Sequence, residues 1–173
     1  MQMDNVSQYY GVVTLELLTK NKRHLLSRQL NEGTINLFSA YAAALTGQNI
    51  SNLIPSTIDI GSLNTTSSGL DLNSFESALN TSGALASVVY VSDTTDESYQ
   101  KYNVPYTRVT ASFTKLMIGN TITVNHYLVL KSYSNKILAT IKINDEISSI
   151  LNNLTPGSQF IIIWDLYVTN KTE

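Results

Sequence analysis

Few residues of this chain are of types that carry catalytic chemistry. Its 173 residues include no cysteine and two histidines, His24 and His126, which are far apart and each embedded in strand-like sequence. General acid–base catalysis needs a positioned partner, so an isolated histidine in a strand is most often structural. The chain has no Gly-x-Ser-x-Gly motif, no glycine-rich phosphate loop and no His-Glu-x-x-His motif. The sequence therefore predicts a protein that is not an enzyme and has no cofactor.

Asp93, Asp96 and Glu97 form the strongest candidate for a metal site, because calcium prefers carboxylate oxygens presented by a loop. Their spacing does not match an EF-hand, and no glycine follows at the position that such a loop requires. A solvated acidic loop is the favoured interpretation, and no metal site is predicted. Asp145 and Glu146 are interpreted as the charged first turn of a short helix.

Tyrosines indicate a different activity, the recognition of another surface. The chain has 10 Tyr against 1 Trp and 4 Phe. An exposed tyrosine offers a large contact area with a polar tip at little entropic cost, which suits protein interfaces and sugar faces. The alternative, of about equal weight, is that the rings pack locally over sheet edges. Five tyrosines in the N-terminal segment and one loop are the candidate interface residues: Tyr9, Tyr10, Tyr99, Tyr102 and Tyr106.

The composition is that of one globular domain with few charges. Hydrophobic residues make up 43% of the chain and charged residues 14%, against about a quarter charged in typical domains. Neutral polar surface costs little to desolvate, which favours extensive contacts. A net charge of -2 without a basic run argues against nucleic-acid binding, and the apolar runs are too short to cross a membrane. The N-terminus lacks the features of a signal peptide, so synthesis in the cytoplasm is expected.

Hydrophobic periodicity predicts a mainly β fold, a β-sandwich or flattened barrel of about eight strands with one α-helix packed on it. A hairpin is predicted over residues 12–30, with its turn at Asn21-Lys22. Apolar spacing from Ile35 to Leu45 predicts an amphipathic helix, with Thr34 or Asn31 at its start and Gly47 at its end. Further strands are predicted over residues 57–61, 84–91, 108–114, 122–130 and 137–143, and a short helix or an irregular turn over 145–151.

The last predicted strand, Phe160 to Val168, follows a Pro156-Gly157 turn and must complete a sheet, with Trp164 in the core. The polar segments 62–73 and 93–103 are predicted as long loops. The chain shows no repeat, linker or change of composition. The predicted organisation is an N-terminal arm, residues 1–10, that reaches a neighbour, followed by a single domain over residues 11–173.

The order of several short motifs resembles the small β domains of tailed-bacteriophage virion proteins, especially tail-fibre, baseplate and neck-associated proteins. Asn31-Glu32-Gly33 leads into the helix, and the segment from Pro55 to Gly61 reads Pro-Ser-Thr-Ile-Asp-Ile-Gly. Arg108 to Phe113 and the Pro156-Gly157 closing strand complete the pattern, which covers most of the chain from Asn31. The chain departs from the pattern after Gly61, where Ser-Leu and a long polar segment replace a glycine-rich Gly-Thr-Gly.

This resemblance implies assembly and no chemistry, so no catalytic residue comes with it. It implies a structural protein of the virion, in the tail, neck or baseplate, that forms homo-oligomers and docks onto neighbouring virion proteins. The residues also leave an alternative from another class, a carbohydrate-binding or receptor-binding β-sandwich. In that reading Tyr99, Tyr102 and Tyr106 stack on a host glycan.

Overall fold

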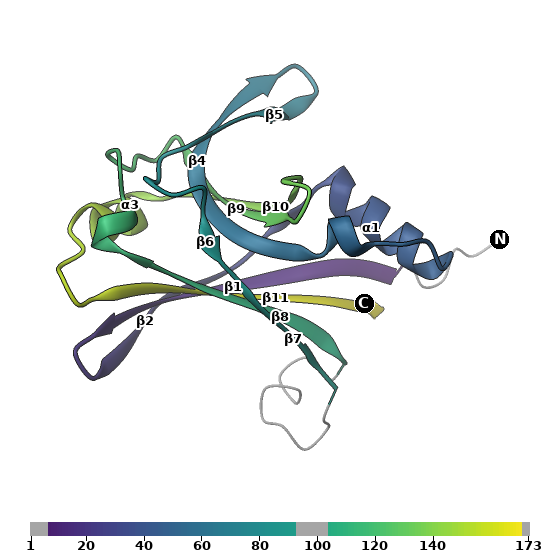
Figure 1. The fold of residues 1–173 in the computed structure, drawn as a ribbon, viewed down its shortest axis with the longest axis horizontal. Coiled ribbons are helices and arrows are strands. Elements are labelled where there is room, and N and C mark those ends of the chain that lie inside the picture. The colour runs from purple at the N-terminus through teal and green to yellow at the C-terminus, as the bar shows by residue number, and fades with distance from the viewer. Residues whose placement is uncertain (1–6, 93–103, 171–173) are drawn as a thin grey trace.

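The structure is a computed structural model that describes residues 7–92 and 104–170. This part of the chain is mainly β, with two antiparallel sheets packed face to face and helices at their margins (Figure 1). The predicted sandwich with a packed helix is therefore confirmed. Over the described ranges, no helix combines the length and the apolar character needed to cross a membrane.

The first sheet, called here the β1 sheet, has the strand order β2-β1-β11-β8-β7. The predicted hairpin forms with its turn at Lys20 and Asn21, and the C-terminal strand lies in the centre of the sheet between β1 and β8. Strand β1 begins at Ser7, so residues 7–10 of the predicted arm are paired with β11. The five strands are β1 (Ser7–Thr19), β2 (Lys22–Leu30), β7 (Ser87–Val91), β8 (Tyr106–Thr114) and β11 (Gln159–Asn170).

The second sheet, called here the β4 sheet, has the order β3-β10-β9-β4-β5, and β6 also pairs with β4. The turn that joins β9 to β10 has Asn135 at a left-handed φ of 62°. The strands are β3 (Glu32–Gly33), β4 (Pro55–Thr66), β5 (Gly69–Ser77), β6 (Ala84–Leu85), β9 (His126–Ser132) and β10 (Ile137–Lys142).

The segment predicted as a polar loop, residues 62–73, is instead a β-hairpin. It comprises the end of β4 and most of β5, joined by a turn in which Gly69 has a φ of 123°. Sparse apolar residues stabilise it: Leu63 belongs to a small buried cluster with Val129 and Ile137, and Leu70, Leu72 and Phe75 pack against that cluster. The prediction followed the Ser, Thr and Asn content and missed this apolar face.

Strand β9 begins at His126, four residues after the start predicted at Ile122. Ile122 is buried, but its backbone bonds to helix α3 (Asp145–Asn152) and not to a strand. Its N–H donates to Asn152 Oδ1, and its carbonyl accepts from Ser148 Oγ and Asn152 Nδ2, each at 2.8 Å. Alternating apolar residues indicate burial but do not require pairing with a strand. Here side chains of helix α3 provide the hydrogen bonds to the Ile122 backbone that a neighbouring strand would otherwise provide.

Both predicted helices form. In α1 (Ile35–Leu45), Thr34 is the N-cap residue, but its hydroxyl donates to the carbonyls of Ile137 (2.6 Å) and Leu138 (3.1 Å) and so ties the helix to β10. In α3, the Asn144 side chain accepts the Ile147 N–H at 2.9 Å, as a capping residue does. Two short 3-10 turns complete the description, η1 (Ser51–Leu53) and η2 (Lys115–Met117).

Helix α1 ends in the conformation predicted for Gly47. The Gln48 N–H bonds to the Ala43 carbonyl and the Gly47 N–H to the Ala44 carbonyl, which is the Schellman pattern, and Gly47 has a φ of +70°.

We expect Gly47→Val to lower the free energy of unfolding by about 1–2 kcal/mol, because a β-branched residue is strained in the left-handed region. A Cβ at Gly47 would meet no atom within 4 Å, so the cost comes from the backbone alone. Gly47→Asn is the control and should lose less, since Asn tolerates this conformation. Equal urea midpoints for both variants and the parent would contradict the expectation.

The main core lies between the two sheets. It includes Val13 and Trp164 from the β1 sheet and Ile60 and Leu130 from the β4 sheet, all fully buried. The core position predicted for Trp164 is therefore confirmed. The smaller cluster around Val129 lies on the other face of the β4 sheet, where β5 covers it.

Candidate functional site

Helix α1 presents an uncharged, apolar surface to solvent. Its sequence, INLFSAYAAAL, has no charged side chain, and among its 11 residues only Leu37 is classed as buried. Ile35, Phe38 and Leu45 are 70%, 44% and 83% exposed. A helix that is apolar on all sides is normally covered, and contiguous exposed apolar side chains mark interaction surfaces. Helix α1 is therefore the strongest candidate for a contact surface.

An apolar groove of about 430 Å³ lies beside this helix. Strand β7 contributes to its lining, and the sequence of β7, SVVYV, is also uncharged. Within the described residues β7 pairs with β8 alone, so its outer edge is unpaired there, and an uncharged, exposed edge strand is a template for association. Residues from both sheets and from α1 line the groove, among them Leu37, Tyr41, Ile54, Val88, Tyr90 and Leu166. We call α1, β7 and this groove together the α1–β7 surface.

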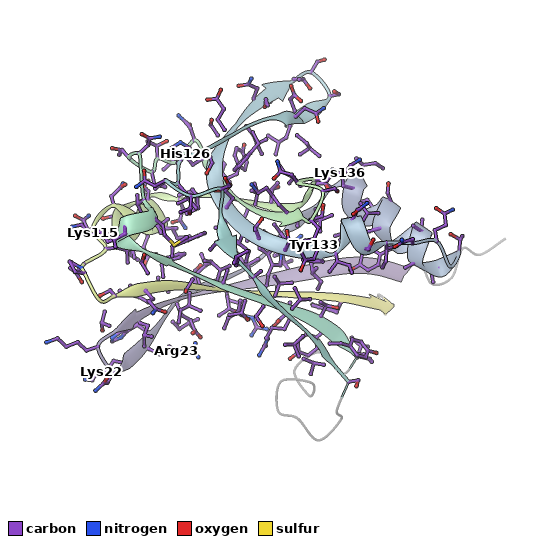
Figure 2. All side chains as sticks on the ribbon, in the orientation of Figure 1. Lys22, Arg23, Lys115, His126, Tyr133 and Lys136 are labelled. Carbon is purple, nitrogen blue, oxygen red and sulfur yellow. The ribbon has the colours of Figure 1, made fainter. Side chains whose placement is uncertain are left out.

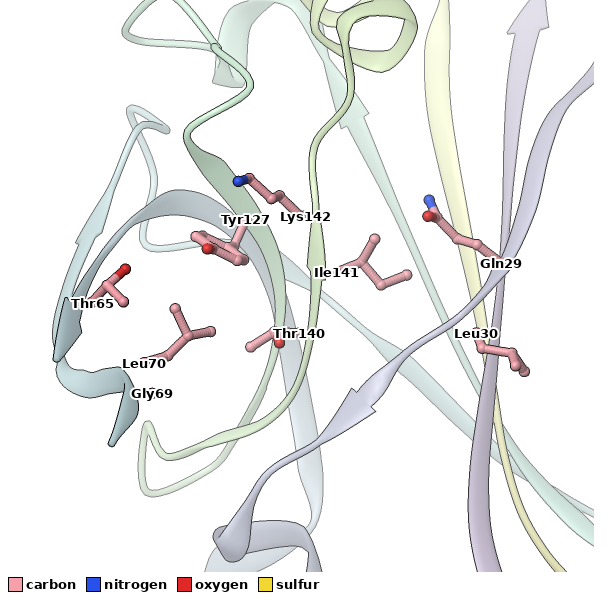
Figure 3. A pocket seen from close by; sticks show the side chains of 9 residues that line it. All are labelled: Gln29, Leu30, Thr65, Gly69, Leu70, Tyr127, Thr140, Ile141 and Lys142. Atoms are coloured by element: carbon pink, nitrogen blue, oxygen red, sulfur yellow. The ribbon is translucent and has the colours of Figure 1, made fainter. Parts of the chain in front are cut away.

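A second cavity, of about 380 Å³, opens between strand β2 and the β4 sheet (Figure 3). Gln29 and Leu30 line it from β2, and Tyr127, Thr140 and Lys142 line it from β9 and β10. The Gln29 Nε2 atom is buried without a hydrogen-bond partner in the described structure. The lining mixes single polar groups with aliphatic side chains, and no cluster of titratable groups converges there.

A buried ion pair is the most concentrated polar feature of the interior. Asp59 on β4 and Lys131 on β9 have side chains that are 0% and 6% exposed, and Lys131 Nζ lies 2.8 Å from Asp59 Oδ2. The Lys131 ammonium also lies 5.2 Å from the centre of the Phe75 ring, within the range of a cation–π contact. Desolvation of two charges is costly, so a pair of this kind persists only with close geometry and further hydrogen bonds.

Those further hydrogen bonds are present at the other carboxylate oxygen. Asp59 Oδ1 accepts from Ser77 Oγ at 2.6 Å and from the Ile60 N–H at 2.8 Å. The aromatic cover depends on Gly61, because a Cβ there would lie 2.7 Å from Phe75 Cζ and 2.0 Å from the Glu76 carbonyl oxygen. The glycine therefore allows β5 to approach and close over the pair.

A second ion pair joins β8 to β11. Arg108 donates to Asp165 from Nε (2.7 Å) and from Nη2 (2.9 Å), a two-point contact that fixes the guanidinium plane. The Asp165 side chain is 1% exposed and that of Arg108 is 28% exposed. The arginine therefore reaches solvent, whereas the lysine of the other pair does not.

Among the five candidate tyrosines, the structure describes the side chain of Tyr106. Tyr9 and Tyr10 lie on strand β1, and Tyr99 and Tyr102 lie outside the described residues. Tyr106 is 2% exposed, with the Arg108 guanidinium 5.4 Å from its ring centre. This corrects the expectation of an exposed ring, because Tyr106 belongs to strand β8 and not to the preceding loop.

The two histidines have local structural contacts. His24 Nε2 lies 3.5 Å from Thr19 Oγ1 across the β1–β2 hairpin, and His126 Nδ1 accepts the Thr123 N–H at 2.8 Å. Burial lowers the pKa of His126 below its ordinary value of 6.5.

The described residues also contain no cluster of possible metal ligands. Across the described ranges, no three His, Asp or Glu side chains are grouped to hold a metal ion. The predicted acidic loop with Asp93, Asp96 and Glu97 lies outside the described residues.

Sequence reasoning missed both strong features of the structure. The spacing in α1 predicts an amphipathic helix packed on the sandwich, whereas the lack of any charge in this segment was the available signal for a covered surface. Two single charges lie within apolar strand sequence. They are Asp59, between Ile58 and Ile60, and Lys131, after Val129 and Leu130. Opposite charges of that kind indicate a buried pair only once the strand pairing is known.

The chain was compared with family models, with curated proteins and with solved structures, and none of them matches it.

Proposed function

We propose that this chain is a non-enzymatic structural protein that self-associates through the α1–β7 surface and docks onto neighbouring proteins of a tailed-phage virion, in its tail, neck or baseplate. The observation that carries the self-association is the uncharged, largely exposed helix α1 beside an uncharged edge strand. The assignment to a virion rests on the order of motifs from Asn31 to the closing strand.

A second copy of the chain is the occupant that the surface favours. Ile35, Phe38 and Leu45 are exposed on α1, and Leu37 and Tyr41 of the same helix line the apolar groove, so one copy carries both exposed apolar side chains and an apolar recess. Neither α1 nor β7 offers a charge that would select a partner of opposite charge. Closed, symmetric association of identical chains is also the commonest form of oligomer.

We expect Leu45→Lys to weaken self-association at least about tenfold. Burial of one leucine contributes about 1.5–3 kcal/mol, and about 1.4 kcal/mol corresponds to a tenfold change in affinity. Lysine is a good helix former, so the fold should persist. Sedimentation velocity over a range of concentrations measures the effect.

Leu116→Lys is the matched control. Leu116 is 87% exposed, and its neighbour Lys115 lies at the opposite end of the molecule from α1 (Figure 2). The parent and the control should form oligomers at concentrations where Leu45→Lys sediments as a single chain. A parent that remains monomeric throughout, or two variants that dissociate equally, would reject the α1–β7 surface as the interface.

The carbohydrate-binding alternative has less support. It rests on Tyr99 and Tyr102, which lie outside the described residues, and on Tyr106, whose ring is buried.

A further inference from the structure

The buried pair of Asp59 and Lys131 brings together the two groups from which an amide forms. An amine nitrogen and a carboxyl group lie side by side on neighbouring strands, in contact at 2.8 Å. We propose that Lys131 and Asp59 condense to an amide that cross-links β9 to β4 covalently. This modification is independent of the assembly proposed above.

The two carboxyl oxygens of Asp59 have different surroundings. Oδ2 accepts a hydrogen bond from the attacking group, Lys131 Nζ. Oδ1 accepts hydrogen bonds from the Ser77 hydroxyl and the Ile60 N–H. The Leu79 N–H donates to Ser77 Oγ at 3.2 Å, so a lone pair of that oxygen is occupied and its hydrogen is directed at Asp59. Two fixed donors on one oxygen stabilise the negative charge that develops there when a nucleophile adds to the carbon.

The position of the amine also suits the reaction. Atoms that react in a preorganised site lie about 3–3.5 Å apart. Lys131 Nζ lies 2.8 Å from Asp59 Oδ2, so its distance from Cγ, the carbon bonded to that oxygen, is close to this range. The flexible methylene chain of lysine allows Nζ to move from the edge of the carboxyl group to its face.

The pair is shielded from solvent, which favours the release of water in the condensation. The side chains of Asp59 and Lys131 are 0% and 6% exposed, and the Phe75 ring faces the ammonium. Val129, the register partner of Asp59 on β9, is fully buried. Exclusion of bulk water also protects a reactive intermediate from hydrolysis and other side reactions.

The step balances without any further reactant. One proton passes from Nζ to Oδ2, and the neutral amine then adds to Cγ, which places negative charge on Oδ1. A second proton passes from Nζ to Oδ2, the Cγ–Oδ2 bond breaks, and Oδ2 leaves as water. The Nζ–Cγ bond remains as an amide, with no net change of oxidation state.

Intact-mass spectrometry of the purified, folded chain after denaturation tests the proposal. The expected mass is lower than the sequence mass by one water molecule. Tryptic digestion should yield a branched peptide that joins the segments around Asp59 and Lys131, with no cleavage after Lys131. The closed loop should also make the denatured chain migrate faster in a denaturing gel than an unlinked variant.

Two variants make the result specific. Lys131→Arg keeps a cation beside Asp59 but removes the amine nucleophile, so its mass should equal that of its own sequence. Asp59→Asn should lose ammonia in place of water, because the leaving group is then the amide nitrogen. The branched peptide of the parent decides the question even where a variant fails to fold. A parent with its full sequence mass after prolonged incubation, or a water loss that persists in Lys131→Arg, would overturn the proposal.

Discussion

Replacing Trp164 with alanine is expected to lower the free energy of unfolding by about 3–5 kcal/mol, the cost typical of removing a large aromatic side chain from a core. Trp164 is 0% exposed and lies in register with Val13 on β1 and Val109 on β8, both fully buried. Its removal would therefore open a cavity at the centre of the β1 sheet, where the surrounding strands have little freedom to collapse.

Trp164 also makes a polar contact that alanine would lose. Its Nε1 donates to Asn31 Oδ1 at 2.9 Å, and Asn31 in turn sits against Gly11, where a Cβ would lie 1.4 Å from that oxygen. The contact ties the C-terminal strand to the residue that follows β2. Glycine at position 11 leaves the room that the asparagine side chain occupies.

Urea unfolding followed by circular dichroism measures this effect, since the variant lacks the only tryptophan. Trp164→Phe is the control, because it keeps a large ring and removes the N–H. It should lose less than the alanine variant, with part of its loss due to the unpaired Asn31 oxygen. A loss below about 1 kcal/mol for Trp164→Ala would mean that this ring contributes little to the core.

The fold was predictable wherever local chemistry and burial agree. Pro156-Gly157 followed by an apolar run marked the closing strand, and Gly157 has the left-handed φ of 84° that such a turn needs. The hairpin over residues 62–73 was not predictable from composition, because its few apolar residues pack on the outer face of the β4 sheet, away from the main core. That face exists only after β4 and β9 have paired.

The candidate sites were less predictable because each depends on contacts between distant segments. Apolar spacing in α1 predicted a helix, and the structure confirms it. The spacing could not show that the sandwich closes its core while leaving Ile35 and Leu45 in solvent. Asp59 and Lys131 are 72 residues apart, and only the pairing of β4 with β9 brings their side chains together.

Replacing Asp59 with alanine is expected to lower the free energy of unfolding by about 3–5 kcal/mol, because it leaves the Lys131 ammonium buried without its carboxylate. Phe75 and β5 cover the lysine, so the charge cannot reach water without local opening of the hairpin. If the chain carries the proposed amide, the loss becomes larger still, since the variant then also lacks the cross-link.

Asp165→Ala is the matched control for this prediction, because Asp165 is also a buried carboxylate paired with a cation. The partner that it leaves behind, Arg108, is 28% exposed and can be hydrated, so the expected loss is smaller, about 1–3 kcal/mol. Urea unfolding of both variants gives the comparison. Equal losses would show that the missing hydrogen bonds set the cost. Where the parent has its full sequence mass and so no amide, a clear excess for Asp59→Ala would show that the buried, unpaired charge sets the cost, and that β5 remains closed over Lys131 in the folded chain.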